Sequence, residues 1–218
     1  MKQLFSKLLI VVFLIPGCLN GPPWEQGRFR EPELVEVTKL DPTIRLDIRY
    51  ATTDNFMRRQ VYTQARAFLQ RPAAEALVRV NRLLHEEGYG LVIFDAYRPW
   101  SVTKHIWDLA TDADRKNNFV ANPREGSKHN RGCAVDLSLF DLKTGSEFVM
   151  LSGFDEYSER AYPTYPGGTS ESRRLCDLLR HVMETQNFDG SNEVWWHLNY
   201  HDWRNYRRLN IPFEMIDQ

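Results

Sequence analysis

The chain has 218 residues, of which 42% are hydrophobic and 26% are charged, and this is enough for one hydrophobic core in a single globular domain. Its formal net charge of -1 comes from interspersed basic and acidic residues, which argues against a nucleic-acid-binding protein and against broad attraction to an anionic membrane. A small or neutral partner is expected instead.

The amino terminus has the pattern of a signal peptide. Two lysines precede the apolar run 8–15, which is shorter than the roughly 20 residues of a membrane-spanning helix. The segment 14–18 resembles a bacterial lipobox, with Pro16 as an irregular member, so Cys18 is expected to become the lipidated first residue of the mature chain. An ordinary cleaved signal is the alternative. The protein is therefore expected in the periplasm or cell envelope, attached to the membrane through Cys18 if it is lipidated.

Three segments are predicted along the chain. They are a signal peptide or lipobox at 1–18, a tether at 19–32, and a folded domain at 33–218. The domain contains Cys133 and Cys176. An exported protein can form a disulfide, but two small buried thiols are the preferred prediction. No feature of the sequence indicates an oligomeric state.

The first half of the domain is expected to mix strands and helices. Alternating apolar residues predict half-buried strands at 34–37 and 44–50. Pro72 and apolar residues at helical spacing predict a helix that ends at Gly88. The continuous apolar run 91–94 predicts a strand that is buried on both faces.

Asp95 and Arg98 follow this buried strand, at an edge where functional residues often lie. Taken alone, Arg98 is explained more simply as a surface arginine that pairs with Asp95 and is held extended by Pro99. Ser101 is expected to cap a helix that runs to Ala110, and the histidine on that helix is expected to be structural.

His129 and Asp136 are candidate ligands for one metal ion. In a helix they would stand about 10.5 Å apart along the axis, and in a regular strand they would point to opposite faces. A turn at 130–132 followed by a strand at 134–140 solves this, because Gly132 permits the dihedral angles that fold His129 back beside Asp136. For an isolated histidine and aspartate, a turn residue and a solvated strand residue would be the simpler explanation.

The alternating segment 193–201 is the expected second half of the site, a strand that follows a helix at about 171–186. Glu193 and His197 share one face of this strand. His197 and His201 have the spacing of a helical zinc pair in zincins, but the glutamate required after the first histidine is replaced by Leu198. His201 is therefore expected to be a polar residue near the end of the strand.

Together these residues would form the site of a hydrolase. Two histidines and one aspartate leave a fourth tetrahedral position for water, and a metal ion lowers the pKa of that water to about 7. Glu193 would take the proton, and Arg98 would stabilise the oxyanion that forms when hydroxide attacks an amide carbonyl. The three candidate ligands are His129, Asp136 and His197.

Longer motifs give the sequence a family resemblance. Ser127-Lys128-His129-Asn130-Arg131-Gly132-Cys133-Ala134-Val135-Asp136 matches the SxHxxGxAxD signature of the VanX-type D-alanyl-D-alanine dipeptidases. Further matches lie at 47–56, 94–99, 195–197 and 209–213. In order and in spacing, the motifs cover nearly all of the chain from about Glu36 to Ile216.

The resemblance implies an α+β fold with helices packed on a central antiparallel sheet, and a confined cleft on the sheet that holds one Zn²⁺ ion. Its ligands would be His129, Asp136 and His197. It also implies that Arg98 acts on the transition state, and that Ser127 and Asp155 help to hold a small zwitterionic D,D-dipeptide. The expected activity is hydrolysis of D-Ala-D-Ala in cell-wall turnover or glycopeptide resistance. A zinc D,D- or L,D-carboxypeptidase that trims longer peptidoglycan peptides is the nearest alternative.

One position departs from the family pattern. The family usually has its catalytic glutamate three residues before the last zinc histidine, as in EWWH, and here that position is Val194. Glu193 lies one residue further away, where a regular strand would separate the α-carbons of Glu193 and His197 by about 13 Å. A bulge at Val194 or Trp195 would shorten this distance and is the preferred prediction. A non-catalytic zinc domain that binds cell-wall peptides is the alternative.

Overall fold

The computed structural model describes residues 21–116 and 119–216. Its strands are β1 (Leu34–Glu36), β2 (Arg45–Leu46), β3 (Phe68–Gln70), β4 (Tyr89–Asp95), β5 (Ala134–Asp141), β6 (Phe188–Gly190) and β7 (His197–Tyr200). Its α-helices are α1 (Val37–Leu40), α2 (Arg71–Glu86), α3 (Trp100–Leu109), α4 (Asp112–Lys116) and α5 (Ser170–Thr185). Its 3₁₀ helices are η1 (Arg49–Ala51), η2 (His129–Arg131), η3 (Glu159–Ala161), η4 (His201–Asn205) and η5 (Phe213–Met215).

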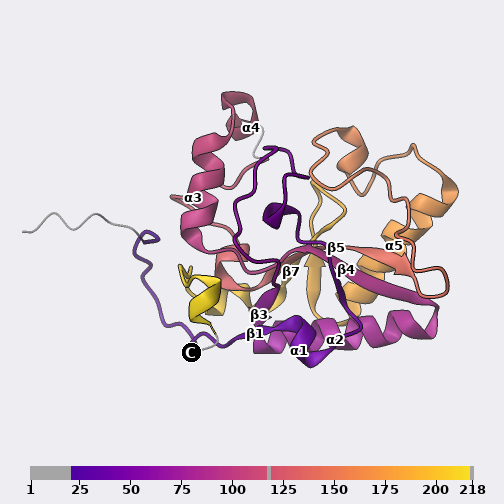
Figure 1. Ribbon diagram of the computed structural model, residues 1–218, viewed down its shortest axis with the longest axis horizontal. Helices are drawn as coiled ribbons and strands as arrows, with labels where there is room; N and C mark the ends of the chain where they lie inside the picture. Colours follow the sequence, from indigo (N-terminus) through magenta and orange to yellow (C-terminus); the bar gives the residue numbers. More distant parts are fainter. Residues whose placement is uncertain (1–20, 117–118, 217–218) are drawn as a thin grey trace, which may run out of the picture.

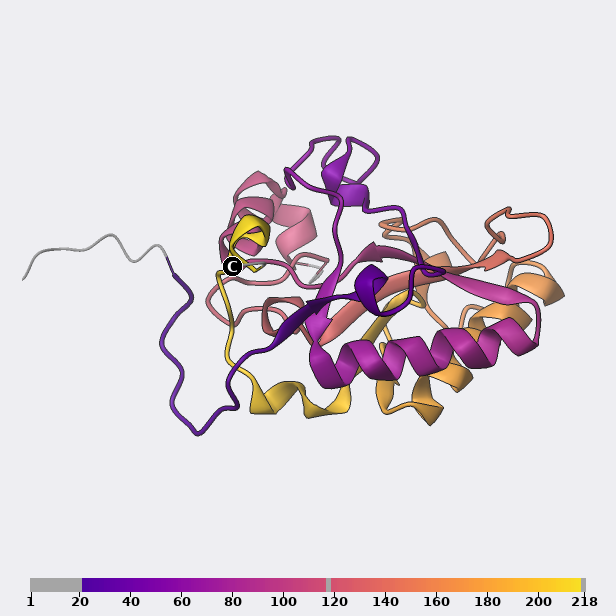
Figure 2. The ribbon, with the colours of Figure 1, turned by 60° about the horizontal axis from the view of Figure 1, so that its bottom comes forward.

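A five-stranded sheet with the order β2-β4-β5-β7-β6 forms the centre of the molecule (Figure 1). Its neighbouring strands are antiparallel except for β2 and β4, which are parallel. Helices α2 and α5 contact each other and cover one face of the sheet, while the long loops and α3 lie on the opposite side (Figure 2). The predicted α+β fold is confirmed, with a parallel edge strand added to the antiparallel sheet.

Helices α2 and α5 bury the apolar stripes that the sequence spacing predicts. Pro72 lies in the first turn of α2, and the helix ends just before Gly88, which has a left-handed φ of +88°. A capping box begins α5, because the Thr169 side chain accepts a hydrogen bond from the Ser172 N–H group. These helices close the core beneath β4 and β5 and so fix the strands that carry the candidate site.

The strand predicted at 44–50 is shorter than the alternation suggests. In the segment 44–50, pairing stops at Leu46, and the chain enters the turn η1. The Asn55 side chain holds this turn by donating to the carbonyl groups of Arg49, Thr52 and Arg59, so the backbone is satisfied without a sheet partner. Ile48 and Tyr50 are nevertheless buried, which explains why their spacing resembled that of a strand.

The predicted strand at 193–201 is wrong before His197. The N–H groups of Glu193 and Val194 lie 3.0 and 3.4 Å from the Ser191 hydroxyl oxygen. The Trp195 N–H group donates to the Ala161 carbonyl at 2.9 Å, and the chain turns at residues 195–196. Hydrogen bonds to the Ser191 side chain and to the Ala161 carbonyl group therefore replace strand pairing over these residues.

The helix start predicted at Ser101 is also wrong. Helix α3 begins at Trp100 with Pro99 as its N-cap residue. The Ser101 N–H group donates instead to the side chain of Asn210, at 2.8 Å. The first turn of α3 is therefore capped by the side chain of Asn210, which is distant in sequence, and not by the hydroxyl group of Ser101.

Residues 21–32 form neither helix nor strand, but they contact the domain, since the Arg30 N–H group donates to the Asn205 carbonyl at 2.8 Å. The predicted signal peptide and Cys18 lie outside the described residues. Cys133 and Cys176 are buried free thiols, as preferred from the sequence. Burial raises the pKa of Cys133 to about 12 and that of Cys176 to about 11, so neither thiol is poised to react. Among the described helices, none combines the length and apolarity needed to cross a bilayer.

Candidate metal centre and active site

The turn between His129 and Asp136 has the form that the sequence predicts. The turn η2 carries His129 and ends at Gly132, whose φ of +67° is in the left-handed region. The Gly132 carbonyl accepts a hydrogen bond from the Gln70 N–H group at 2.8 Å, and the His129 carbonyl accepts one from the Arg98 N–H group at 3.1 Å. These bonds hold His129 over the start of β5.

Strand pairing brings the second histidine to the same place. Asp136 on β5 lies directly opposite His197 on β7 in the antiparallel ladder. Directly opposed residues project from the same face of a sheet, so their side chains meet. The residues of the predicted strand that do form a strand, 197–200, therefore include His197 and position it.

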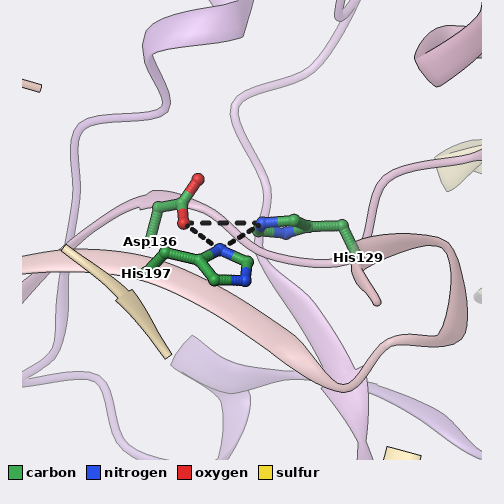
Figure 3. A group of neighbouring side chains, drawn as sticks. All are labelled: His129, Asp136 and His197. Carbon is green, nitrogen blue, oxygen red and sulfur yellow. Dashed lines mark hydrogen bonds and ion pairs between the residues drawn. The ribbon is translucent and has the colours of Figure 1, made fainter. Parts of the chain in front are cut away.

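His129, Asp136 and His197 meet at their ligand atoms (Figure 3). The His197 Nδ1 atom lies 2.8 Å from Asp136 Oδ1 and 3.2 Å from His129 Nε2. The distance between His129 Nε2 and Asp136 Oδ1 is 3.4 Å. Ligand atoms placed tetrahedrally at about 2.0 Å from one zinc ion would be separated by about 3.3 Å, so the spacing fits a single ion.

The hydrogen bonds of the ring nitrogens that face away from the cluster also favour a bound cation. The second ring nitrogen of each histidine faces an oxygen that can only accept: His129 Nδ1 lies 2.6 Å from the Ala96 carbonyl, and His197 Nε2 lies 2.9 Å from Asn199 Oδ1. Each outer nitrogen therefore carries the hydrogen in the neutral ring, and a lone pair points inward. Burial opposes ionisation of Asp136, but the two histidines outweigh it and hold the pKa of its carboxyl below the ordinary value. Three electron-pair donors thus face one point.

Arg98 is buried, which corrects the simpler interpretation of a surface arginine. Its pairing with Asp95 is as expected: Asp95 Oδ2 accepts from Arg98 Nε at 3.0 Å and from the terminal nitrogen at 2.5 Å. The other carboxylate oxygen accepts from the Tyr62 hydroxyl at 2.7 Å. Burial alone would lower the pKa of Arg98, but the charge of Asp95 outweighs it and raises that pKa well above the ordinary value. The guanidinium therefore stays charged beside the metal ligands.

The predicted site residues all line one cavity of about 280 Å³: Arg98, Ser127, His129, Asp136, Asp155, Glu193 and His197. Glu193 is exposed and lies on the turn that replaces the predicted strand. Neither the predicted regular strand nor the predicted bulge is present, because a turn occupies these residues. The role of Glu193 as the general base stays a prediction. The zincin alternative is wrong, because His197 belongs to β7 and the half-exposed His201 to η4.

Asp155 lines the cavity and has an unusual backbone, since its φ is +57°. The hydroxyl groups of Tyr50 and Tyr157 lie 3.3 and 3.2 Å from its Oδ1 atom. Its Oδ2 atom is buried and has no hydrogen-bond partner among the described residues. Burial, together with the charge of Asp136, raises the pKa of Asp155 to about 7. A buried carboxylate oxygen without a partner is suited to receive a positively charged group.

The cluster of aromatic rings around Tyr157 in the cavity wall was not predicted. Phe119 stacks on Tyr157, with ring centroids 4.3 Å apart, and Phe56 packs edge-on against Tyr157 at 5.4 Å. Tyr50 and Phe56 were within a matched motif, so their positions could have been inferred from the resemblance. Phe119 and Tyr157 lie in loops with no pattern of their own, and their pairing is a property of the tertiary structure.

Comparison with known proteins gives the family. The family model for M15 peptidases, described as D-ala-D-ala dipeptidase, matches residues 30–214. The chain is 33% identical over 181 residues to the D-alanyl-D-alanine dipeptidase of Escherichia coli (strain K12), covering 83% of this chain and 91% of that protein. It is 31% identical to the D-alanyl-D-alanine dipeptidase of Enterococcus faecium, covering 71% of this chain and 84% of that protein. The chain therefore belongs to the D-Ala-D-Ala dipeptidase family of M15 peptidases, as its motifs indicated.

Proposed function

We propose that the protein is a zinc-dependent dipeptidase that hydrolyses D-Ala-D-Ala. The observation that carries this proposal is the set of three electron-pair donors that face one point in the wall of the cavity. Two imidazole nitrogens and one carboxylate oxygen are a donor set that zinc takes in catalytic sites, where a fourth position stays open. Family membership supports both the metal and the substrate.

The side chains around the ligands can divide the chemistry of amide hydrolysis. Zinc, when bound, would polarise the scissile carbonyl and make a water molecule acidic. Glu193 would receive the proton of the attacking water and pass it to the leaving amine. Arg98, held charged by Asp95, would stabilise the negative charge that develops on the carbonyl oxygen.

Asp155 would bind the charged amino terminus of the dipeptide. Asp155 offers its unpartnered Oδ2 atom to this ammonium group, and Tyr50 and Tyr157 support the other oxygen. Ser127, on the loop that leads to His129, would help to hold the dipeptide. A substrate with two alanines matches a cavity of about 280 Å³ that is walled by aromatic rings.

The location of the protein is a further part of the proposal. The lysines, apolar run and cysteine of residues 1–18 support export to the periplasm or cell envelope and attachment through a lipidated Cys18. A cell-envelope dipeptidase would act in cell-wall turnover or in glycopeptide resistance. Labelling with a radioactive fatty acid, compared between the natural chain and Cys18→Ala, tests the attachment.

Release of free D-alanine from D-Ala-D-Ala by the purified protein tests the activity. A chelator is expected to abolish the release and added zinc to restore it. His129→Ala should lose both zinc and activity, whereas His105→Ala, which changes an exposed histidine on α3, should lose neither. A protein fully loaded with zinc that leaves the dipeptide intact would contradict the proposal.

A further inference from the structure

The carboxylate of Glu25 is fixed at several points, although it lies in a segment without helix or strand. The segment 21–29 precedes the part of the chain that the family model matches, and it runs beside the C-terminal residues (Figure 2). Glu25 Oε1 accepts a hydrogen bond from Arg131. Its Oε2 atom accepts from the Arg208 N–H group at 2.8 Å and lies 3.2 Å from Arg208 Nε. The side chain is only 14% exposed, so these arginines, rather than water, surround it.

Both arginines are attached to the loop that carries Ser127 and His129. Arg131 lies in η2, and its other terminal nitrogen donates to the Tyr206 carbonyl. Arg208 donates to the Arg124 carbonyl at 2.9 Å and packs against Gly126, where an added Cβ would lie 2.2 Å from Arg208 Cδ. Glu25 therefore joins two arginines that hold the loop from its two ends.

The two guanidinium groups depend on Glu25 for charge balance. The side chains of Arg131 and Arg208 are 11% and 8% exposed. Within the described residues, Glu25 is the carboxylate that forms an ion pair with each of them. Removing one member of a buried pair leaves an uncompensated charge, which is strongly destabilising. Without Glu25, two such positive charges would remain beneath a loop that must hold a metal cation.

We propose that Glu25 is a positioning residue for the metal centre. It keeps Arg131 and Arg208 in place, and through them it fixes the backbone that aims His129 at the ion. This inference rests on the proposed metal centre. It also assigns residues 23–30 to the catalytic domain, although their composition resembles that of a tether.

Zinc release from the Glu25→Gln variant of the full-length, zinc-loaded protein tests the proposal. The rate is measured with a chelating dye, without substrate, together with hydrogen exchange of the amides of residues 127–132. We expect release about 10-fold faster than from the natural protein, at the lower end of the effect of residues that support metal ligands, and faster exchange in the loop. Glu25→Asp keeps the charge and is expected to retain zinc longer than Glu25→Gln.

Glu36→Gln is the matched control. Glu36 is also bound by an arginine through two hydrogen bonds, from Arg66 at 2.9 and 2.6 Å, and its side chain is 12% exposed. This pair joins β1 to the segment before β3, so its loss should lower the unfolding temperature without changing zinc release. Equal zinc release from both variants would overturn the proposal, and so would a destabilised Glu25→Gln protein that keeps its zinc as long as the natural one. A protein that binds zinc but does not cleave D-Ala-D-Ala would overturn the proposed function alone, because the release assay contains no substrate.

Discussion

At the scale of single residues, Glu193 is the proposed general base, on which the activity of the metal site would depend. It lines the cavity from an exposed turn, where its carboxylate is accessible to water. A glutamine at this position keeps the shape but cannot accept a proton from water. We expect Glu193→Gln to lower kcat about 10²- to 10⁴-fold, which is the usual contribution of a general base.

Zinc content separates loss of the base from loss of the metal. Glu193→Gln should bind as much zinc as the natural protein, measured by elemental analysis after gel filtration. Glu86→Gln, at the exposed end of α2, should change neither quantity. An unchanged kcat in Glu193→Gln would mean that another group takes the proton.

The proposed role of Asp155 in substrate binding predicts a specific pH dependence. Its carboxyl has a pKa raised to about 7, so it is neutral below this pH and ionised above it. Only the ionised form can pair with the ammonium group of a dipeptide, whose own pKa is about 8. KM for D-Ala-D-Ala should therefore fall as the pH rises through about 7 and rise again above about 8. The charge of a bound zinc ion would oppose that of Asp136 and so lower the pH at which the first of these changes occurs.

Initial rates across this pH range check the assignment. In Asp155→Asn, the fall in KM on the acid side should disappear, while the rise on the alkaline side, which belongs to the substrate, should remain. If the acid limb persisted in Asp155→Asn, it would have to be assigned to a different group.

At the scale of elements, the turn at Gly132 is the connection that makes the metal site possible. An added Cβ would lie 2.5 Å from Leu34 Cδ2 and 3.2 Å from the Gln70 nitrogen, and the φ of +67° is unfavourable for a residue with a Cβ. We expect Gly132→Ala to lower the free energy of unfolding by about 1–3 kcal/mol and to weaken zinc binding, because the loop must move away from β1 and β3. Denaturant unfolding and zinc titration measure the two effects.

Gly88→Ala is the control for backbone strain. Gly88 has a φ of +88°, but an added Cβ meets nothing within 4 Å, and the residue lies at the end of α2 away from the cavity. This variant should lose stability and keep its affinity for zinc. Equal loss of zinc affinity in both variants would show that Gly132 has no special role in positioning His129.

Elements whose pattern is local were predictable from the sequence, and elements set by distant partners were not. Helices α2 and α5 follow from apolar spacing and end signals within their own residues. The turn before β5 follows from one glycine between two candidate ligands. By contrast, the Trp195 N–H group bonds to Ala161, and the Ser101 N–H group to Asn210, and neither partner can be inferred from the alternation or capping of nearby residues.

At the scale of the whole molecule, the elements that form the core and the residues that line the cavity lie on opposite sides of the sheet. The helices α2 and α5 close the core on one side of the sheet, and the long loops lie on the other side (Figures 1 and 2). Residues of these loops line the cavity. Residues far apart in the sequence, such as Tyr50, Phe119 and Tyr157, form its wall. The candidate metal ligands could be found from spacing and resemblance. The shape of the cavity could not, because it depends on how these loops pack together.

The proposed position of the substrate in the cavity predicts how long a substrate can be. In the proposed binding mode, a dipeptide would place its free ammonium group at the unpartnered Oδ2 atom of Asp155. A longer peptide would have an uncharged amide at that point and would extend toward the aromatic rings of Phe56 and Tyr157. A buried polar group left without its partner rejects such analogues strongly, so kcat/KM for N-acetyl-D-Ala-D-Ala should be at least about 100-fold below that for D-Ala-D-Ala. Tyr157→Ala should open the wall and narrow this difference, while Tyr89→Ala, whose ring packs on Phe148 away from the cavity, should not. Comparable cleavage of both peptides by the natural protein would favour a carboxypeptidase that trims longer peptidoglycan chains, and the position of Asp155 would then require a different explanation.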